Sequence, residues 1–451
     1  MRRISLLAPS ARRSALFALA LLALAFAFGC RSAYEPEPLN EAAAVSHLDR
    51  PLESVAVIEP VALTLPQAQA ISILRHPRLE RLRAERGFAD AADIRVDVRP
   101  DPELSLTALW ILPDDVLGGV ASLSWDLLPS GTRDARRGLA GSLRGTIDAR
   151  IAAEEWRVAQ AARIAWLEVV RDQRAIALAE RAEMLARETR DFGRSMLERG
   201  AATGTDVAVL ELALGEAVGD LVARRGALAM SRGRLATALG LPSGQILLPL
   251  AEGDPLEPLV ARVPEGTDDA LLLARLPELR ESRADYALAE RELELAHLGA
   301  LPQLSLGPDA ERDSDSTSFG GGGSVTIPIH DGNRVGIAEA TTRRRIASLA
   351  FEEALFAARA ALAQARAAEA AAARSLAVHE SSVAPLAEAA LDAAQRAIEA
   401  GAADLLTLLL ARQRALEAQR AELDLRAALA IAAAQLEAAF GPEPAAPGEA
   451  P

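Results

Sequence analysis

The sequence contains no lysine, one cysteine and few aromatic residues, which make up 3% of its 451 residues. A single cysteine excludes a disulfide framework and a cysteine-rich metal cluster. All 49 basic residues are arginine, and 63 acidic residues outnumber them, which gives a net charge of −14. This acidity provides no positive field to attract phosphates, so we expect no nucleic-acid partner. Alanine is abundant instead, and with leucine, arginine and glutamate it predicts a mostly helical chain.

Residues 1–29 have the organisation of an export signal. Arginines precede an apolar run from Ser14 to Phe28, which is shorter than the roughly 20 residues of a membrane-spanning helix. Cys30 stands where cleavage is expected, as in a bacterial lipobox, so we predict a covalent N-terminal lipid at Cys30. Arg31, in place of aspartate, implies sorting to the outer membrane. The alternative is an ordinary cleaved signal with an incidental cysteine. Residues 30–63 are expected to run extended from the lipid anchor.

The rest of the chain is a tandem duplication. The two repeats become visible when the sequence is compared with itself at a shift of about 200 residues. At this shift Pro77, Leu79 and Arg83 meet Pro277, Leu279 and Arg283. One residue further, Gly131, Gly200 and Gly240 meet Gly332, Gly401 and Gly441. We place the two repeats at 64–242 and 266–442. A linker or equatorial segment (243–265) joins them, and the tail 443–451 is expected to be disordered.

Each repeat predicts the same elements in the same order. A helix of about thirty residues (66–92 and 267–298) precedes two short strands, and a long helix follows, expected to be continuous over 133–199 and 334–400. A Gly-Ala-Ala break and a closing helix end the repeat. The long helix carries an apolar stripe along its length. A stripe this long cannot be buried inside a compact domain, so the helix must pack in a bundle or coiled coil.

The predicted strands lie at about 103–112, 119–128, 301–308 and 319–330. Polarity alternates along them, which indicates strands with one apolar and one polar face. The apolar face comprises Leu104, Leu106, Trp110, Leu123, Trp125 and Ile327. A transmembrane barrel and a small antiparallel sheet in a soluble domain both fit this alternation. Polar connectors within each strand pair favour the barrel, with the listed side chains on its outer face.

The combined pattern resembles the TolC family of outer-membrane efflux proteins, or outer membrane factors, over about residues 60–442. The first-helix signature is matched by Leu63-Thr64-Leu65 with His76-Pro77-Arg78-Leu79. The strand-to-helix signature is matched by 324–329 running into Asp331-Gly332-Asn333-Arg334, and the tip pattern by Gly200 with Asp206. Residues 100–104 are closest to the heavy-metal-efflux branch.

The resemblance implies a homotrimer of mainly α chains with a small β part. Each chain would contribute four strands to a twelve-stranded transmembrane β-barrel in outer-membrane lipid and its repeated helices to a coiled-coil tunnel in the periplasm. The channel would passively conduct substrate from a periplasmic adaptor (membrane fusion protein) and an inner-membrane pump to the exterior. The resemblance places adaptor docking at the helix tips, near Gly200, Asp206, Gly401 and Asp404. Substrate choice, between metals, drugs and secreted proteins, would lie with the pump.

The second tip departs from the family pattern. Where well-known members carry two aspartates that form an acidic constriction, this chain has Thr407 and Leu410. Our hypothesis is a tip narrowed by leucines, with Leu406, Thr407 and Leu410 at the constriction. The alternative is that these leucines pack within the helix hairpin.

No enzymatic constellation is present in the sequence. The five histidines are scattered, without the spacing of a metal site, and there is no phosphate-binding loop or nucleophile elbow. We therefore predict that the chain is not an enzyme and that it needs no cofactor. The other candidate is a lipid-anchored periplasmic adaptor or spacer without a pore. An adaptor would not require two strand pairs at equivalent positions of a duplicated chain.

Overall fold

The computed structural model describes residues 35–48, 63–111, 116–241, 256, 269–312, 316–400 and 402–442, with the backbone alone at 108–111 and 116–118. Two compact units are present, Met1–Arg50 and Pro51–Pro451. The first unit contains α2 (Glu41–Leu48). Asn40 precedes this helix and caps it, because its Oδ1 accepts a hydrogen bond from Ala43 N at 2.9 Å. The expectation that 30–63 runs extended is therefore wrong at α2, where a capping asparagine and three alanines favour helix. The predicted signal peptide, Cys30 and the tail lie outside the described residues.

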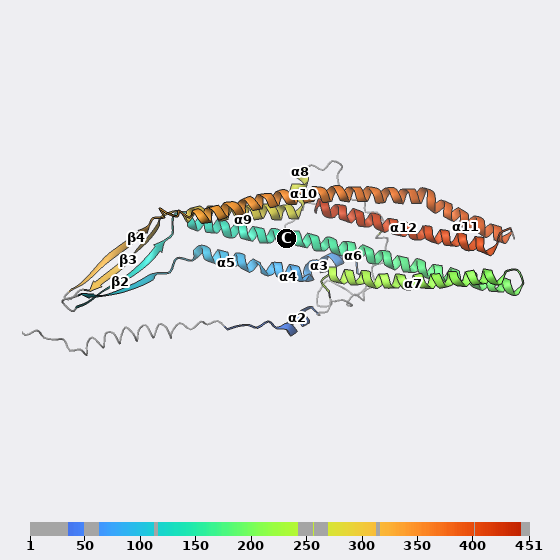
Figure 1. The fold of residues 1–451 in the computed structure, drawn as a ribbon, viewed down its shortest axis with the longest axis horizontal. Helices are drawn as coiled ribbons and strands as arrows, with labels where there is room; N and C mark the ends of the chain where they lie inside the picture. The colour runs from blue at the N-terminus through green and yellow to red at the C-terminus, as the bar shows by residue number, and fades with distance from the viewer. Residues whose placement is uncertain are drawn as a thin grey trace, which may run out of the picture. The chain divides into compact units, whose positions relative to one another are not determined.

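The second unit contains the same element order twice (Figure 1). The first repeat comprises α3 (Leu65–Arg75), α4 (Pro77–Ala84), α5 (Arg86–Asp97), β1 (Glu103–Ile111), β2 (Val116–Leu127), α6 (Thr132–Glu198) and α7 (Gly204–Ala238). The second comprises α8 (Asp269–Arg275), α9 (Pro277–Leu298), β3 (Gln303–Arg312), β4 (Thr317–Thr326), α10 (Arg334–Val378), a π-helical turn (His379–Val383), α11 (Ala384–Glu399) and α12 (Leu405–Phe440). None of the helices in the described part of the chain combines the length and hydropathy of a membrane-spanning segment.

The opening helix of each repeat is broken, where we expected one continuous helix. The breaks fall at His76 and Leu276, which adopt extended backbone directly before Pro77 and Pro277. Proline disfavours helical backbone in the preceding residue, and it has no N–H to donate to the carbonyl four residues earlier. Those carbonyls belong to Ile73 and Leu273.

An arginine replaces the missing donor in both repeats. Arg83 Nη2 donates to the Ile73 carbonyl at 2.9 Å, and Arg283 Nη2 donates to the Leu273 carbonyl at 3.3 Å. Arg83 also binds Glu155 on α6 at 2.7 Å. The recurrence of proline and arginine at matching positions thus has one cause, which is a kink whose exposed carbonyl needs a partner.

We expect Arg83→Ala to destabilise the protein by about 1.5–3 kcal/mol, because a charged donor is removed from a carbonyl and a carboxylate. Arg81→Ala is the matched control, since the ion pair of Arg81 with Glu85 lies on the surface and contributes at most about 0.5 kcal/mol. Thermal unfolding followed by circular dichroism measures both. Equal shifts for the two variants would contradict the role given to Arg83.

A glycine at the end of each repeat packs on the same kink. Gly240 has φ +68°, and a Cβ there would lie 2.8 Å from the Arg75 carbonyl oxygen. Gly441 has φ +91°, and its Cβ would lie 3.0 Å from the Arg275 oxygen. Positive φ and close approach to another backbone both require glycine, and this explains why Gly240 recurs as Gly441.

The second long helix is interrupted, whereas the first is continuous over α6. A π-helical turn at His379–Val383 precedes α11, which has Pro385 in its first turn. Proline leaves a helix hydrogen bond unmade, and the wider turn accommodates the loss. The buried His379 contributes a further contact, with its Nε2 lying 2.9 Å from the Ala418 carbonyl of α12. The expectation of one helix over 334–400 is therefore wrong at this turn.

The four strands form one antiparallel sheet in the order β1-β2-β3-β4. The central pair, β2 and β3, comes from different repeats, with Trp125 opposite Leu306 and Leu127 opposite Leu304. β4 ends at Thr326, so Ile327, predicted to lie within this strand, follows it instead. Pro328 cannot donate a ladder hydrogen bond, and this limits the strand.

The main hydrophobic core lies where α3, α6, α7 and α12 meet. Its buried residues include Leu63, Trp166 and Leu235, and Trp166 Nε1 donates to the Leu63 carbonyl at 3.4 Å. Leu256, from the segment predicted as a linker, is buried in the same cluster. Residues 243–255 and 257–265 of that segment lie outside the described residues.

Candidate functional site

One face of the sheet is apolar and open to the surroundings. Cross-strand partners share a face, so the register aligns Leu104 with Leu123, Trp125 with Leu306, and Leu304 with Val325. Leu106 is 61% exposed and Trp125 is 40% exposed, and Leu123 is half-buried. Trp110 lies on β1, and its side chain is outside the described residues. A continuous apolar surface of this kind is typical of a site that contacts lipid or another protein.

The opposite face of the sheet is polar. Ser105 pairs with Ser122 across β1 and β2, and the hydroxyls of Ser305 and Ser324 lie 2.7 Å apart across β3 and β4. The sheet therefore separates an apolar side from a side suited to water.

The glycine run in β4 lets β3 side chains lie over the strand. A Cβ at Gly323 would lie 2.8 Å from Leu306 Cδ2, and one at Gly320 would lie 3.1 Å from Asp309 Oδ1. The run thus provides close packing between the two strands.

The outer edges of the sheet are β1 and β4, which pair with no further strand in the described part of the chain. An open edge presents unpaired backbone groups and templates the addition of another strand. Four strands with two open edges are incomplete as a membrane-spanning sheet, because backbone groups in lipid must all be satisfied.

The first helix tip, between α6 and α7, is closed by a capping box. Gly200 ends α6 with φ +74°, and Thr203 and Asp206 then cap α7. The Asp206 carboxylate accepts from Thr203 N at 2.8 Å and from its hydroxyl at 2.7 Å. These hydrogen bonds lower the pKa of Asp206, so its carboxylate stays charged at neutral pH.

The second tip uses a different cap. Asp404 is itself the N-cap of α12, and its carboxylate accepts from the hydroxyl and backbone N of Thr407. These bonds lower the pKa of Asp404. Thr407, at a position predicted for the constriction, is thus a partner of Asp404. Gly401, a predicted docking residue, lies outside the described residues.

The sequence left open whether the tip leucines form a constriction or pack within the helix hairpin, and the structure shows some of them buried and others exposed. Leu405 and Leu408 are buried, and a Cβ on Gly193 of α6 would contact Leu405 at 3.2 Å. They pack within the helices. Leu406 and Leu410 face outward from the same turns and are 37% and 56% exposed. Helical spacing therefore places Leu406, Thr407 and Leu410 on one free face of α12.

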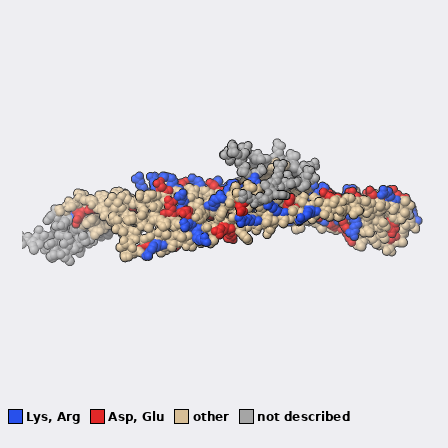
Figure 2. Space-filling view, turned by 90° about the horizontal axis from the view of Figure 1, so that it is seen from above, with Lys and Arg blue, Asp and Glu red and all other residues tan. Residues whose placement is uncertain are grey.

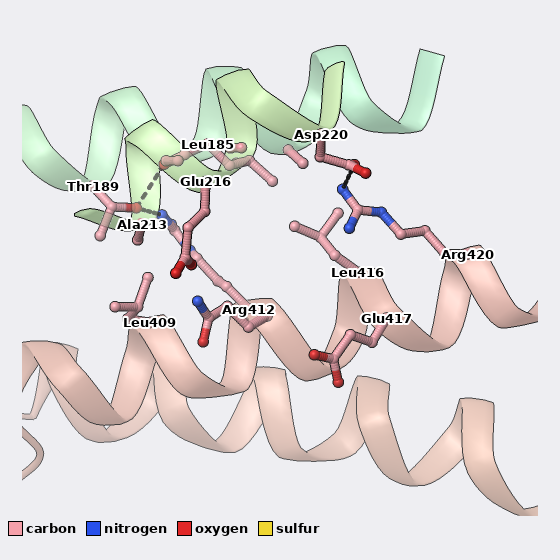
Figure 3. Close-up of a pocket in the computed structure, with 14 residues that line it drawn as sticks. Leu185, Thr189, Ala213, Glu216, Asp220, Leu409, Arg412, Leu416, Glu417 and Arg420 are labelled. Atoms are coloured by element: carbon pink, nitrogen blue, oxygen red, sulfur yellow. Dashed lines mark hydrogen bonds and ion pairs between the residues drawn. The ribbon is translucent and has the colours of Figure 1, made fainter. Parts of the chain in front are cut away.

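A cavity of about 320 Å³ lies between α6, α7 and α12, near the tip ends of these helices (Figure 3). Arg412 of α12 donates to the Thr189 hydroxyl of α6 at 2.6 Å, and Arg420 pairs with Asp220 of α7 at 2.8 Å. These bonds join the two repeats. Sequence reasoning did not find this cavity, because each helix alone shows only an ordinary alternation of alanine and charge.

Ion pairs also join the repeats nearer the sheet. Arg150 of α6 binds Glu281 and Asp285 of α9, each at 3.3 Å. Burial raises the pKa of Asp285, and the Arg150 guanidinium opposes that shift. Figure 2 shows arginines and acids interspersed along the helices, so part of the acidity serves the helix contacts. Among the residues that the structure describes, no group of three or more His, Cys, Asp and Glu side chains is placed to hold a metal ion.

One protein family matches part of the sequence. The sequence profile of the outer membrane efflux protein family matches residues 270–442, which span the second repeat. The second repeat of the chain is thus similar to this family. A comparison with curated protein sequences finds no match. The first repeat lies outside the profile match, although its helices and strands follow the same order.

Solved structures with the same fold cover nearly all of the repeats. CusC, described as forming a transmembrane channel, has a TM-score of 0.70 at 18% identity over 84% of this chain and 92% of its own. The MtrE outer membrane channel of Neisseria gonorrhoeae has a TM-score of 0.68 at 20% identity, over 84% and 88%. VceC, an outer membrane protein of Vibrio cholerae, has a TM-score of 0.65 at 18% identity, over 84% and 96%. The predicted TolC-like fold is confirmed.

The family description is that of an efflux protein in the outer membrane, not that of an enzyme. The adaptor reading is not favoured, since each repeat supplies its own helical hairpin and its own strand pair to a shared sheet.

Proposed function

We propose that three copies of the chain form one outer-membrane channel, in which each copy contributes its sheet to a closed twelve-stranded barrel. The observation that supports this most directly is the four-stranded sheet with an exposed apolar face and open edges at β1 and β4. Pairing β4 of one copy with β1 of the next removes the edges, and closure turns the apolar face toward lipid.

The channel conducts passively and performs no chemistry. Its helices extend the conduit into the periplasm, where an adaptor docks at the tips around Gly200–Asp206 and Gly401–Asp404. An inner-membrane pump loads the substrate and determines which substrate passes. Support comes from the family's description as an efflux protein and from the polar inner face of the sheet.

Planar-bilayer recording tests the channel. Purified protein reconstituted without adaptor or pump should give discrete current steps of uniform size. A preparation that inserts into bilayers as the trimer and yet passes no current under any applied voltage would contradict the proposal.

The narrowest point of the channel lies at the exposed α12 face of Leu406, Thr407 and Leu410. Three copies bring these side chains together around the axis, and hydrophobic constrictions gate by excluding water. We expect the double variant Leu406→Ala and Leu410→Ala to raise the single-channel current severalfold.

Leu405→Ala is the matched control for the constriction, because Leu405 is buried against α6 and lies beside the same face. Its current should match that of the wild type. An unchanged current in the double variant would disprove the leucine constriction and leave the channel itself standing.

The lipid at Cys30 anchors the mature N-terminus to the outer membrane. Lipobox resemblance supports this assignment, and Cys30→Ala tests it. We expect wild-type protein to incorporate labelled palmitate and the variant to incorporate none. Equal labelling of the two would contradict the lipid anchor.

A further inference from the structure

The ends of the helices next to the sheet are rich in arginine. These ends and their links to the strands comprise residues 94–102, 128–145, 291–302 and 327–345, which we call the collar segments. They contain eleven arginines and seven acidic residues, in a chain whose net charge is −14. They contain no Trp, Tyr or Phe. Tryptophan and tyrosine are common anchors at the border between hydrocarbon and water, so arginine is the anchoring side chain that remains here.

The lengths of the strands place the collar segments at the depth of the lipid headgroups. β1 to β4 contain 9, 12, 10 and 10 residues. A tilted strand needs about 9–11 residues to cross the hydrocarbon of a membrane, so these strands have almost none to spare. In the proposed barrel the hydrocarbon therefore ends where the strands join the helices. The headgroups on the helix side of the membrane then lie beside the collar segments.

Almost half of the collar arginines are free of acidic partners. Six form ion pairs, as Arg133 does with Asp97 and Arg344 with Glu290. Within the described residues, the five that form no ion pair are Arg95, Arg99, Arg136, Arg334 and Arg345. Two collar acids, Asp101 and Asp331, are equally free there. Each copy thus retains an excess of unpaired positive charge at the sheet end of its helices.

The sign of the unpaired charge reverses further along the second long helix. In α10 and α11 beyond Arg345, the arginines that form no ion pair with a described residue are Arg374 and Arg396. The acids in the same position are Glu352, Glu353, Glu369, Glu388, Asp392 and Glu399. Figure 2 shows basic side chains gathered at the end of the helical array next to the sheet. The unpaired positive charge is therefore a local feature of the sheet end.

Helix stability does not explain the arginine at the start of α10. The N-terminal end of a helix has a partial positive charge, which favours acids there and disfavours arginine. α7 and α12 follow this preference, with Asp206 in the first turn and Asp404 at the N-cap. α10 instead begins with Arg334 and has no acid in its first turn. A cation that the helix itself disfavours indicates an anionic partner outside the helix.

Backbone contacts hold the Arg334 guanidinium in position. Its Nη2 donates to the His330 carbonyl at 2.7 Å, and its Nε donates to the Asp331 carbonyl at 3.2 Å. A guanidinium has five N–H donors, so others remain for a further acceptor, and the side chain is exposed. A positioned and exposed guanidinium is suited to bind phosphate through two parallel hydrogen bonds.

We infer that the collar segments bind the phosphate groups of phospholipids in the membrane leaflet on the helix side. The inference rests on the proposed three-copy channel and names the lipid chemistry that its helix ends recognise. Leu127 and Ile327, both exposed, lead from the apolar sheet face into the collar segments. One phospholipid can therefore contact the sheet with its chains and the arginines with its headgroup.

Lipid selectivity measured by electron spin resonance tests the inference. The trimer is reconstituted in phosphatidylcholine vesicles that contain a trace of spin-labelled phosphatidylglycerol or of spin-labelled diacylglycerol, which has no phosphate. The wild type should immobilise the phosphatidylglycerol more strongly than the diacylglycerol. The triple variant Arg99→Gln, Arg334→Gln and Arg345→Gln should lower this preference by about fivefold or more.

The matched control is the triple variant Arg181→Gln, Arg374→Gln and Arg396→Gln. It removes three exposed arginines that form no ion pair with a described residue and that lie outside the collar segments. Its lipid preference should equal that of the wild type. Salt provides a second measurement without any variant. Raising the ionic strength from about 0.1 M to about 1 M shortens the Debye length from about 10 Å to about 3 Å and should reduce the wild-type preference.

The outcomes separate this inference from the proposed channel. A conducting wild-type trimer without a preference for the phosphate-bearing lipid would overturn the collar assignment alone, and so would a preference that the collar variant retains. If the collar variant does not assemble, salt decides, because a wild-type preference unchanged at about 1 M salt would overturn the assignment. Absence of any conducting wild-type trimer would overturn the proposed channel as well.

Discussion

Leu106→Arg is expected to abolish assembly in the outer membrane. Leu106 lies on the apolar face of β1 and is 61% exposed, and the proposed barrel turns this face toward lipid. An arginine on the lipid-facing side of a transmembrane strand costs about 2–4 kcal/mol near the middle of the bilayer, and the cost recurs in each of three copies. We expect the trimer band of outer-membrane fractions on unboiled gels to fall below detection.

The neighbouring residue provides the control for this prediction. Thr107 follows Leu106 on β1, and the side chains of successive strand residues point to opposite faces. Thr107→Arg places the same charge on the polar side, where water is available, and should leave most of the trimer intact. Loss of the trimer in both variants would indicate that β1 tolerates no arginine, and equal survival would contradict the assignment of the apolar face to lipid.

Gly240→Val is expected to destabilise the helical part by about 2–6 kcal/mol. Backbone strain at a positive φ contributes about 1–3 kcal/mol, and overpacking contributes a similar amount. The overpacking arises because the new Cβ would lie 2.8 Å from both the Arg75 carbonyl oxygen and His76 Cα, which are backbone atoms that cannot rotate away. Leu239 and Leu241, on either side, are buried in the main core, so the glycine cannot move without disturbing it.

Thermal unfolding of the purified protein, followed by circular dichroism, measures the effect. Gly145→Val is the control, since Gly145 lies within α6 and has nothing within 4 Å of its added Cβ. We expect the control to shift the free energy of unfolding by no more than about 0.5 kcal/mol. Similar melting temperatures for both variants would disprove the account of Gly240 as the residue that fits the kink.

Much of the fold could be predicted from the sequence, because it depends on patterns of neighbouring residues and on the internal duplication. Alternation along Leu104, Ser105 and Leu106 predicted which side chains share a sheet face, because the side-chain period of a strand is two. Duplication predicted the order of elements, and Gly200 with Asp206 predicted the turn between α6 and α7. Each of these patterns depends on a few neighbouring residues or on a repeat that can be compared directly.

Features that depend on distant contacts were not readable in this way. Nothing near Trp125 or Leu306 specifies that β2 pairs with β3, since the intervening chain includes α6 and α7. Leu256 looked like part of a linker, although it is buried in the main core. Pro77 was visible as a proline within a predicted helix, but the carbonyl that Arg83 satisfies appears only once the kink is seen.

The helix tips could be predicted from the sequence only in part. Sequence comparison identified Thr407 and Leu410 as departures from an acidic constriction, and it left open whether the leucines pack or line the channel. The turn of α12 separates them, because Leu405 and Leu408 are buried while Leu406 and Leu410 are exposed. That separation depends on the direction in which α12 leaves its Asp404 cap, which the spacing of leucines alone does not determine.

Carbonate extraction of outer membranes followed by unboiled gel electrophoresis tests the central claim most directly. The three-copy channel predicts that the protein stays in the carbonate-washed membranes and runs as a trimer-sized band, which heating converts to the single chain. A carbonate-soluble single chain would contradict the channel and would favour the alternative, a periplasmic adaptor or spacer without a pore.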